Sequence, residues 1–370
     1  MSLKEQIQQH ARSLGFDLVG ITTAQAPDHA AAFQQWLAAG RHGEMTYLAR
    51  RSAERTNLDQ VLPGAKSVIV LGMNYYIENS AEPTRVSPPL EGICKSDSPP
   101  PASPPKPWRR REGPGVGFVR IARYAWGSRD YHEIIGEKLE QLAAFIRARS
   151  GPTTKTRSYV DTGPVLERDL AQRAGLGFIG KHTNLINRGL GNWLFLGEIL
   201  TTLELPVDRP EKEYCGTCTR CLAACPTRAI VAPYQLDARL CISYLTIELK
   251  GSIPVALRPL IGDRVFGCDD CLEVCPWNRF ARLSPLREFQ RRDLPLLTEF
   301  LAWDDRQFSD FFRNTPIHRL KRRGFLRNVC VALGNRGDLG ARPALDRAVH
   351  DTEPLVREHA AWALEQLAAK

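Results

Sequence analysis

The alternation of apolar and polar positions in the first part of the chain predicts helices and strands in turn. Apolar residues recur at helical spacing over 5–16 and over 28–40, and Gly40 marks the end of the second helix. Short apolar runs over 17–24 and 66–76 have the length and composition of buried strands. Elements that alternate in this way indicate a mixed α/β or α+β domain.

The same alternation returns after a polar interruption. Residues 116–150 predict a strand and then a long helix, 156–163 predict a further strand, and 164–175 a further helix. Glycine-punctuated turns and a buried strand or hairpin follow over 176–202. We therefore expect an α+β multidomain protein whose first domain is an α/β unit over 1–205.

The interruption has a different composition. Residues 79–114 are rich in proline and serine and include the basic triplet Arg109 to Arg111. Such a segment cannot bury a core, so it predicts a disordered-type loop inserted into the first domain. Cys94 falls within this loop, and we interpret it as incidental.

The C-terminal part of the chain predicts helices alone. Residues 326–338 and 356–368 resemble each other, because each has an arginine near its start and an Ala-Leu pair a few positions later. Short helical repeats stack on one another, since one repeat cannot bury its apolar face. We expect a HEAT-like helical repeat domain over 283–370. Two ordinary helices with a coincidental pattern are the alternative.

Composition and charge narrow the functional classes. Of the 370 residues, 43% are hydrophobic, yet no run approaches the roughly 20 apolar residues of a membrane span. The N-terminal segment lacks the apolar region of a signal peptide, so we expect a cytoplasmic protein without a membrane partner. The formal net charge of +9 is compatible with a nucleic-acid partner, and equally with a solvated basic surface.

The cysteines are concentrated in one segment. Eight of the ten lie between Cys215 and Cys275, in a region that we expect to form a ferredoxin-type module over 206–282. Residues 215–226 have the C-x₂-C-x₂-C-x₃-C-P spacing that wraps a 4Fe–4S cluster, and 268–276 have the same pattern with one cysteine missing. Clustered thiols of this kind indicate metal rather than disulfides.

The crossing rule of two-cluster ferredoxins assigns the first cluster. In those proteins the fourth cysteine of each run binds the other cluster. Three ligands of the first cluster are then Cys215, Cys218 and Cys221. The fourth ligand is Cys275, which ends the second run.

The same rule leaves the second cluster one ligand short. Cys268 and Cys271 bind it directly, and Cys225 crosses from the first run. Cys241 is the one unassigned cysteine nearby, so we expect it to be the fourth ligand. Zinc sites, or one cluster with stray cysteines, are the alternatives.

Longer motifs around the cysteines resemble those of a known family. They are "LARRSAERTNLDQVLPGAKSV", "RYAWGSRDYH", "YVDTGPVLERDLAQRAGLGFIGKHTNLI", "CGTCTRCLAACPTRAIVAPYQLDARLCISYLTIE", "GCDDCLEVCPWN" and "VREHAAWALEQL". Together they are similar to the epoxyqueuosine reductases, which catalyse the last step of queuosine synthesis in tRNA. The resemblance covers nearly all of the chain outside 79–114.

The resemblance implies a cobalamin between the first domain and the cysteine module, although the chain has no D-x-H-x-x-G cobalt-binding motif. Asp161 matches the family's general acid, and we expect burial to raise the pKa of this carboxyl. From the residues alone, an N-cap of the next helix is the favoured interpretation of Asp161, and the resemblance reverses that preference. The matching cofactor contacts are Arg55, Ala122, Asp161, Leu185, Leu196 and Ser243.

The resemblance also implies the reaction and the partners. The chain would reduce epoxyqueuosine at the wobble position of a tRNA anticodon stem-loop, as a monomer fed by an external low-potential reductant. The basic run 319–323, Arg327 and Arg357 would contact phosphates, or else be solvated or pair with carboxylates along the helices. His132 would tune a proton path, or else be a hydrogen-bonded histidine at a helix start. Lys181 and His182 would contact the cofactor or simply pack. The alternatives are a reductive dehalogenase-like enzyme for a small molecule and a non-enzymatic electron-transfer adaptor.

Overall fold

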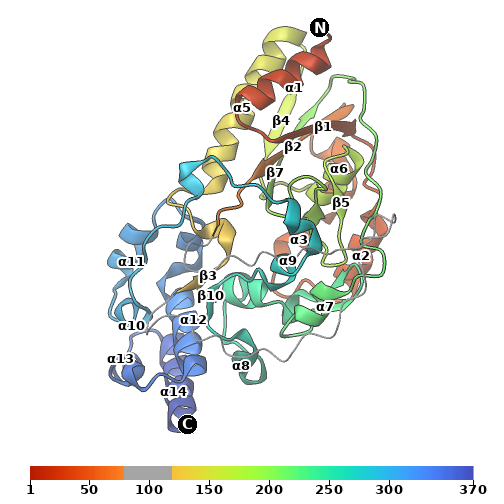
Figure 1. Cartoon of the computed structure of the whole chain (residues 1–370). Coiled ribbons are helices and arrows are strands. Elements are labelled where there is room, and N and C mark those ends of the chain that lie inside the picture. The colour runs from red at the N-terminus through yellow and green to blue at the C-terminus, as the bar shows by residue number, and fades with distance from the viewer. Residues whose placement is uncertain (79–118, 370) are drawn as a thin grey trace.

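The computed structural model describes residues 1–78 and 119–369, and it is built around a four-stranded antiparallel sheet (Figure 1). The strand order is β1-β2-β7-β4. The strand bounds are Leu18–Thr23 for β1, Ser67–Asn74 for β2, Leu194–Thr201 for β7 and Thr156–Tyr159 for β4. The strands predicted within 17–24, 66–76 and 156–163 are confirmed, and the loop expected over 79–114 lies outside the described residues.

Helices cover both faces of the sheet. All eight residues of β2 are therefore buried. On one face, Ile69 and Leu71 pack in a core with Ile7 of α1 and Leu139 of α5. On the other face, Val70 packs against residues of α6. These helices span Leu3–Ser13 for α1, Tyr131–Ser150 for α5 and Glu167–Arg173 for α6. Figure 1 shows α1 and α5 side by side.

Short helices and hairpins complete the first part and form the cysteine-rich part. The helices are α2 (Ala30–Ala38), α3 (Thr46–Arg50), α4 (Ser52–Thr56), α7 (Arg220–Ala224), α8 (Arg258–Ile261) and α9 (Asp270–Glu273). The strands are β5 (Phe178–Ile179), β6 (Leu185–Ile186), β8 (Ile230–Ala232), β9 (Gln235–Leu236), β3 (Arg120–Ile121) and β10 (Arg264–Phe266). The parallel pairing of β3 with β10 ties the cysteine-rich part to the chain that precedes α5.

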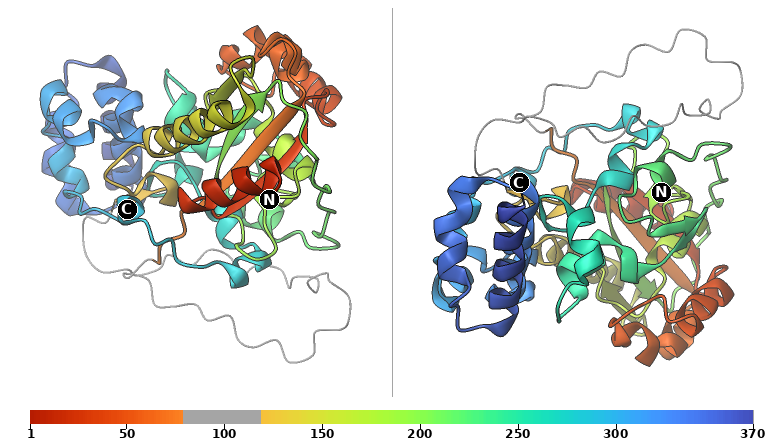
Figure 2. Two further views of the ribbon diagram at one scale, coloured as in Figure 1. Left: turned by 90° about the horizontal axis from the view of Figure 1, so that it is seen from above. Right: turned by 90° about the horizontal axis from the view of Figure 1, so that it is seen from below.

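The last part of the described chain is helical, as the sequence predicts. Its helices are α10 (Leu297–Phe300), α11 (Asp305–Phe312), α12 (Lys321–Arg336), α13 (Arg342–Ala348) and α14 (Pro354–Ala368). Helices α12 and α14 touch closely, since a Cβ on Gly334 would lie 2.9 Å from the Cα of Ala363. Figure 2 shows these helices at one end of the molecule and α2 at the other.

One hydrophobic core joins the C-terminal helices to the cysteine-rich part. Val329 and Cys330 of α12 belong to the same buried cluster as Phe266 of β10 and Ile121 of β3. The HEAT-like repeat and the boundaries at 205/206 and 282/283 remain predictions. Within the described ranges, no helix combines the length and the apolarity that crossing a membrane requires.

Candidate functional site: two cysteine groups and an aspartate turn

Four of the predicted cluster ligands line one pocket. They are Cys215, Cys218, Cys221 and Cys275, which come from both cysteine runs. His182 and Trp277 line the same pocket. The fold therefore brings the last cysteine of the second run to the first three of the first run. Burial raises the pKa of Cys215 and of Cys221 to about 11, so a thiolate ligand there depends on a bound cation for its stabilisation.

The remaining four cysteines form a second group. Cys271 interacts electrostatically with Cys268, Cys241 and Cys225, and Cys241 interacts with Cys225. Cys241, from the segment between the two runs, thus lies near Cys225, Cys268 and Cys271, as the spacing predicted. Among the described residues, no set of three or more metal-binding side chains is arranged for a single ion. A four-iron cube is larger than one ion and takes its thiolates farther apart.

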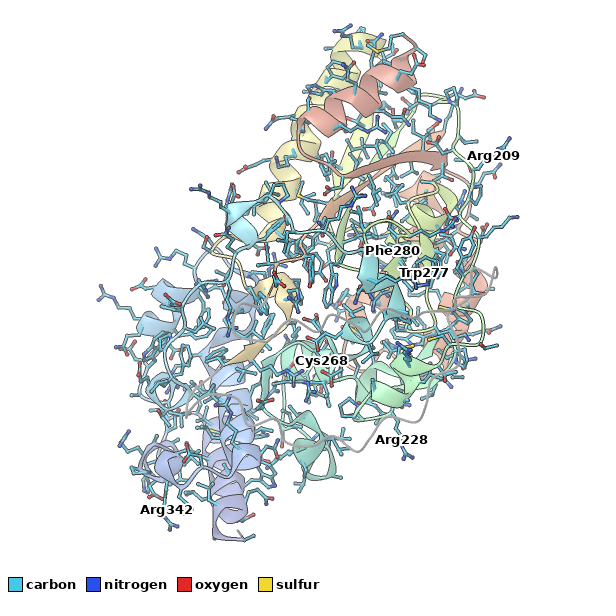
Figure 3. The ribbon with its side chains drawn as sticks, in the orientation of Figure 1. Arg209, Arg228, Cys268, Trp277, Phe280 and Arg342 are labelled. Carbon is cyan, nitrogen blue, oxygen red and sulfur yellow. The ribbon has the colours of Figure 1, made fainter. Side chains whose placement is uncertain are left out.

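Backbone contacts hold the first group in place. The backbone N–H of Lys181 donates to Sγ of Cys215 across 3.4 Å, and its ammonium donates to the carbonyl oxygen of Cys218 across 3.1 Å. Lys181 therefore binds the cysteine loop, where the sequence had left a cofactor contact and simple packing as alternatives. Figure 3 shows Cys268 of the second group, and Trp277, which lines the pocket of the first, in the middle of the molecule and away from Arg342.

Asp161 occupies a strained turn after β4, which we call the aspartate turn. Its φ is +56°, in the left-handed region that few residues other than glycine adopt. Its Oδ2 accepts a hydrogen bond from the phenol of Tyr131 at 2.8 Å and lies 3.4 Å from Nε2 of His132. The N-cap alternative is wrong, because α6 begins at Glu167 with Leu166 as its cap.

The pKa of Asp161 is lowered, which overturns the sequence-based expectation. The surrounding protein removes water and by itself raises this pKa. Hydrogen bonds from His132 and Tyr131, and the charge of His132, outweigh that effect. The side chain is nevertheless 60% exposed, so the carboxylate sits among protein groups and still faces solvent. It is ionised at neutral pH and accessible to a ligand.

His132 lies between two carboxylates and an arginine. Its Nδ1 is 2.7 Å from Oδ1 of Asp130, the N-cap of α5, and its Nε2 faces Asp161. Burial lowers the pKa of His132, but both carboxylates raise it and their effect prevails. Arg319 donates to Asp130 at 3.1 Å and lies 3.3 Å from the imidazole. A residue that we had expected to bind phosphate therefore joins the C-terminal helices to this site.

The predicted cofactor contacts lie around the turn and the second cysteine group. Arg55 is 6% exposed and donates to the carbonyl oxygen of Gly163, so it is not a surface arginine. Ala122 is buried and packs tightly against Gly267, the residue before Cys268. A Cβ added to Gly267 would lie 2.6 Å from the Cβ of Ala122. Ser243 hydrogen-bonds the side chain of Cys241.

Two leucines complete the predicted contacts. Leu185 of β6 is buried, whereas Leu196 is half-buried although it belongs to β7 inside the sheet. Both belong to or pack against the core that contains α6. Leu196 therefore offers apolar surface that the described protein does not fully cover.

The sequence reasoning missed two acidic residues behind Asp161. Glu198 is fully buried in β7, and neither of its carboxyl oxygens has a partner in the described protein. Glu167 starts α6 and has one buried oxygen without a partner. A glutamate within the apolar run "NWLFLGEILTT" was the signal, since an ionisable residue in a buried strand is rarely accidental.

Several arginines assigned to phosphate binding have structural roles. Arg327 is 0% exposed, and its guanidinium donates to backbone carbonyl oxygens between 245 and 251. Arg322 forms a buried ion pair with Asp351. The expectation is therefore wrong for these two residues, whereas Lys321 and Arg323 are exposed.

Two family profiles match the chain. A 4Fe-4S double cluster binding domain matches residues 214–278, which contain both cysteine groups. The epoxyqueuosine reductase QueG profile, DUF1730, matches residues 55–162, which end just beyond the aspartate turn. The chain therefore binds two 4Fe–4S clusters, and the zinc alternative is set aside.

Full-length relatives agree with these profiles. The chain is 43% identical over 369 residues to the epoxyqueuosine reductase of Pseudomonas aeruginosa, covering 98% of this chain and 94% of the relative. It is 42% identical over 365 residues to that of Xanthomonas campestris, with coverages of 98% and 95%. A crystal structure of an epoxyqueuosine reductase with an epoxyqueuosine-modified tRNA-Tyr stem loop has a TM-score of 0.82 and 31% identity, covering 99% of this chain and 90% of that one. This chain belongs to the epoxyqueuosine reductases, the oxidoreductases that reduce epoxyqueuosine to queuosine in tRNA.

Proposed function

We propose that this protein reduces epoxyqueuosine at the wobble position of tRNA and that Asp161 delivers a proton to the departing epoxide oxygen. The observation that carries the role of Asp161 is its environment: a solvent-facing carboxylate in a left-handed turn, bonded by Tyr131 and His132. Groups held in strained conformations by several contacts are typical of catalytic positions.

The stoichiometry of the reaction explains why a proton store beside Asp161 matters. Conversion of an epoxide to an alkene and water takes two electrons and two protons. At rest Asp161 is a carboxylate, and His132 has a raised pKa and holds a proton near it. Substrate that covers the exposed carboxylate removes water from it and raises the pKa of Asp161. The proton then passes from Nε2 of His132 to Oδ2 of Asp161, which are 3.4 Å apart, and on to the substrate oxygen.

The eight cysteines are proposed to hold the two clusters in the groups described above. Cys215, Cys218, Cys221 and Cys275 would bind one, and Cys225, Cys241, Cys268 and Cys271 the other. The second group adjoins Ala122 and Ser243, two of the proposed cofactor contacts. We propose that electrons from an external low-potential reductant enter at the first cluster and leave from the second.

We propose cobalamin as the third cofactor, as the resemblance to the epoxyqueuosine reductases implies, and the residues present fit it. Arg55 is a buried cation whose hydrogen bonds go to backbone carbonyl oxygens, so it can also receive an anionic group. Leu196 offers uncovered apolar surface, and Leu185, Ala122 and Ser243 complete the proposed lining. Bound cobalamin would supply low-potential one-electron chemistry at the epoxide carbon.

The remaining features of the proposal concern the substrate and the organisation of the chain. Lys321, Arg323 and the exposed part of Arg319 are proposed to contact phosphates of the anticodon stem-loop, beside the aspartate turn. We propose a cytoplasmic monomer with an α/β catalytic domain over 1–205, a cluster module over 206–282 and a HEAT-like domain over 283–370.

Nucleoside mass analysis tests the proposal directly. Anaerobically reconstituted protein with about eight irons per chain is incubated with epoxyqueuosine-containing tRNA and a strong chemical reductant, with cobalamin added or omitted. Loss of one oxygen from the nucleoside only when cobalamin is present is the expected result. Unchanged nucleoside with intact clusters would favour a small-molecule enzyme or an electron-transfer adaptor instead.

A further inference from the structure

The pocket of the first cysteine group is lined by two aromatic rings whose buried nitrogens have no partner. His182 and Trp277 line it together with the four cysteines. Nε2 of His182 and Nε1 of Trp277 are each buried without a hydrogen-bond partner in the described protein. Buried polar atoms of this kind are rare, and each calls for an explanation.

The hydrogen bond at the other ring nitrogen of His182 makes Nε2 a donor. The backbone N–H of Asn184 donates to Nδ1 of His182 across 3.1 Å. A nitrogen that accepts a hydrogen bond carries no proton, so the neutral imidazole has its proton on Nε2. The indole nitrogen of Trp277 can only donate. Ile186 and Pro276, which also line the pocket, are apolar and offer these donors no side-chain acceptor.

Packing holds both rings beside the cysteines. His182 is 3% exposed, and a Cβ added to Gly180 would lie 3.2 Å from its Nε2, so a larger residue at 180 would crowd the imidazole. Trp277 packs edge-to-face on Phe178 with 5.8 Å between centroids, in the same buried cluster as Cys275. Because both rings are buried, their N–H groups remain at the pocket and do not turn to solvent.

The sulfur atoms of a cluster in this pocket are the acceptors that fit these two donors. Other N–H groups already point at the thiols, since the backbone of Lys181 donates to Cys215 across 3.4 Å and the backbone of Trp277 donates to Cys275. Arg220 adds a positive charge to the lining. Hydrogen bonds to cluster sulfurs stabilise the extra electron of the reduced cluster, so they raise its reduction potential.

We infer that His182 and Trp277 donate hydrogen bonds from Nε2 and Nε1 to sulfur atoms of the first cluster and thereby raise its reduction potential. Neither residue is an iron ligand. The inference rests on the proposed assignment of this cluster to Cys215, Cys218, Cys221 and Cys275. A raised potential makes this cluster easier to reduce, which suits the proposed entry point for an electron from the external reductant.

Pulsed EPR of wild-type protein tests the contact at His182 directly. The full chain, labelled with nitrogen isotope in its histidines and loaded with both clusters, is reduced chemically without cobalamin or tRNA. Reduced clusters are paramagnetic, so a histidine nitrogen bonded to a cluster sulfur should show a hyperfine coupling. His182→Phe keeps an aromatic ring but has no donor, and it should lack the coupling. Wild-type protein without any histidine coupling would overturn the inference.

A redox titration followed by EPR measures the effect on the potential. In His182→Phe the equilibrium constant for one-electron reduction of the first cluster should fall about tenfold, a shift of about 59 mV to lower potential. The second cluster should keep its potential. Trp277→Phe should shift the first cluster in the same direction, and His182→Gln, which retains an N–H donor, should recover part of the shift. The Cys241→Ala protein, expected to retain the first cluster alone, identifies its signal.

The matched control is Ile186→Val, which changes the packing of the same pocket but removes no donor, so its potential should equal that of wild type. Equal shifts in Ile186→Val and His182→Phe would mean packing alone and would overturn the inference, as would unshifted potentials in His182→Phe and Trp277→Phe. The wild-type coupling and Trp277→Phe decide the question even where His182→Phe loses iron. Protein that shows the coupling and the shift but never converts epoxyqueuosine would disprove the proposed function and leave this inference standing.

Discussion

The phenol of Tyr131 donates a hydrogen bond to Oδ2 of Asp161 across 2.8 Å, and it joins two segments that are 30 residues apart in sequence. Tyr131 begins α5, whereas Asp161 follows β4. The ring of Tyr131 stacks on Phe195 of β7 with 4.2 Å between centroids, so the hydroxyl is held in position by the sheet. The aspartate turn is thus anchored to α5, which covers one face of the sheet.

Tyr131→Phe should move the pH dependence of the reaction. The variant keeps the stacked ring but removes a donor that stabilises the carboxylate, so the pKa of Asp161 rises. The fraction of Asp161 that is protonated then increases at each pH. The alkaline fall of the single-turnover rate should shift to higher pH. An unchanged profile would show that this hydrogen bond does not influence the reacting proton.

Asp161→Asn should abolish turnover without disturbing the cofactors. The amide cannot deliver a proton, so we expect a rate loss of about a hundredfold or more. Iron content and binding of tRNA should stay at wild-type levels, which excludes a folding defect. A variant that retains the wild-type rate would remove Asp161 as the proton donor.

Cys241→Ala should remove one cluster of the two. Its thiol lies with Cys225, Cys268 and Cys271, so its loss leaves three ligands, and iron should fall from about eight to about four per chain. Cys330→Ala is the matched control, because this cysteine is buried away from both groups, in the core of the C-terminal helices. A Cys241→Ala protein with the full iron content would refute the ligand assignment.

Arg323→Ala and Arg327→Ala should separate RNA binding from stability. Arg323 is exposed, so its loss should weaken tRNA binding and reduce the salt dependence of binding by about one ion, with unchanged thermal stability. Arg327 is buried, and its loss leaves carbonyl oxygens without donors, so the free energy of unfolding should fall by about 3 kcal/mol or more. Equal effects of both substitutions on tRNA affinity would contradict this division.

Glu198→Gln should stabilise the protein at alkaline pH. The folded state raises the pKa of Glu198 above the usual 4.5, so its contribution to stability is complete below that pH and is lost as pH rises. Glutamine does not titrate, and the melting temperature of the variant should therefore exceed that of wild type more at pH 9 than at pH 5. In a chain of 370 residues the expected gain is roughly 1–2 °C for each kcal/mol recovered. A difference that does not depend on pH would argue against a raised pKa.

The sequence by itself determined the features that depend on local pattern. Apolar runs predicted β1 and β2, because a buried strand requires several apolar residues in succession. Cysteine spacing predicted the two groups of four thiols. The quoted motifs were sufficient to indicate the family. Pattern did not reveal the protonation of Asp161, because its pKa depends on Tyr131 and His132 from another element.

Tertiary structure decided which polar residues are exposed to a ligand and which are buried in the fold. Arg327 and Arg323 are alike in sequence, but helix packing turns the first inward to backbone carbonyls and leaves the second exposed. Glu198 is one polar position in an apolar strand, and only the covering of β7 by α6 places it with Glu167 behind Asp161. Burial and charge proximity are sums over distant elements, so no single stretch of sequence contains them.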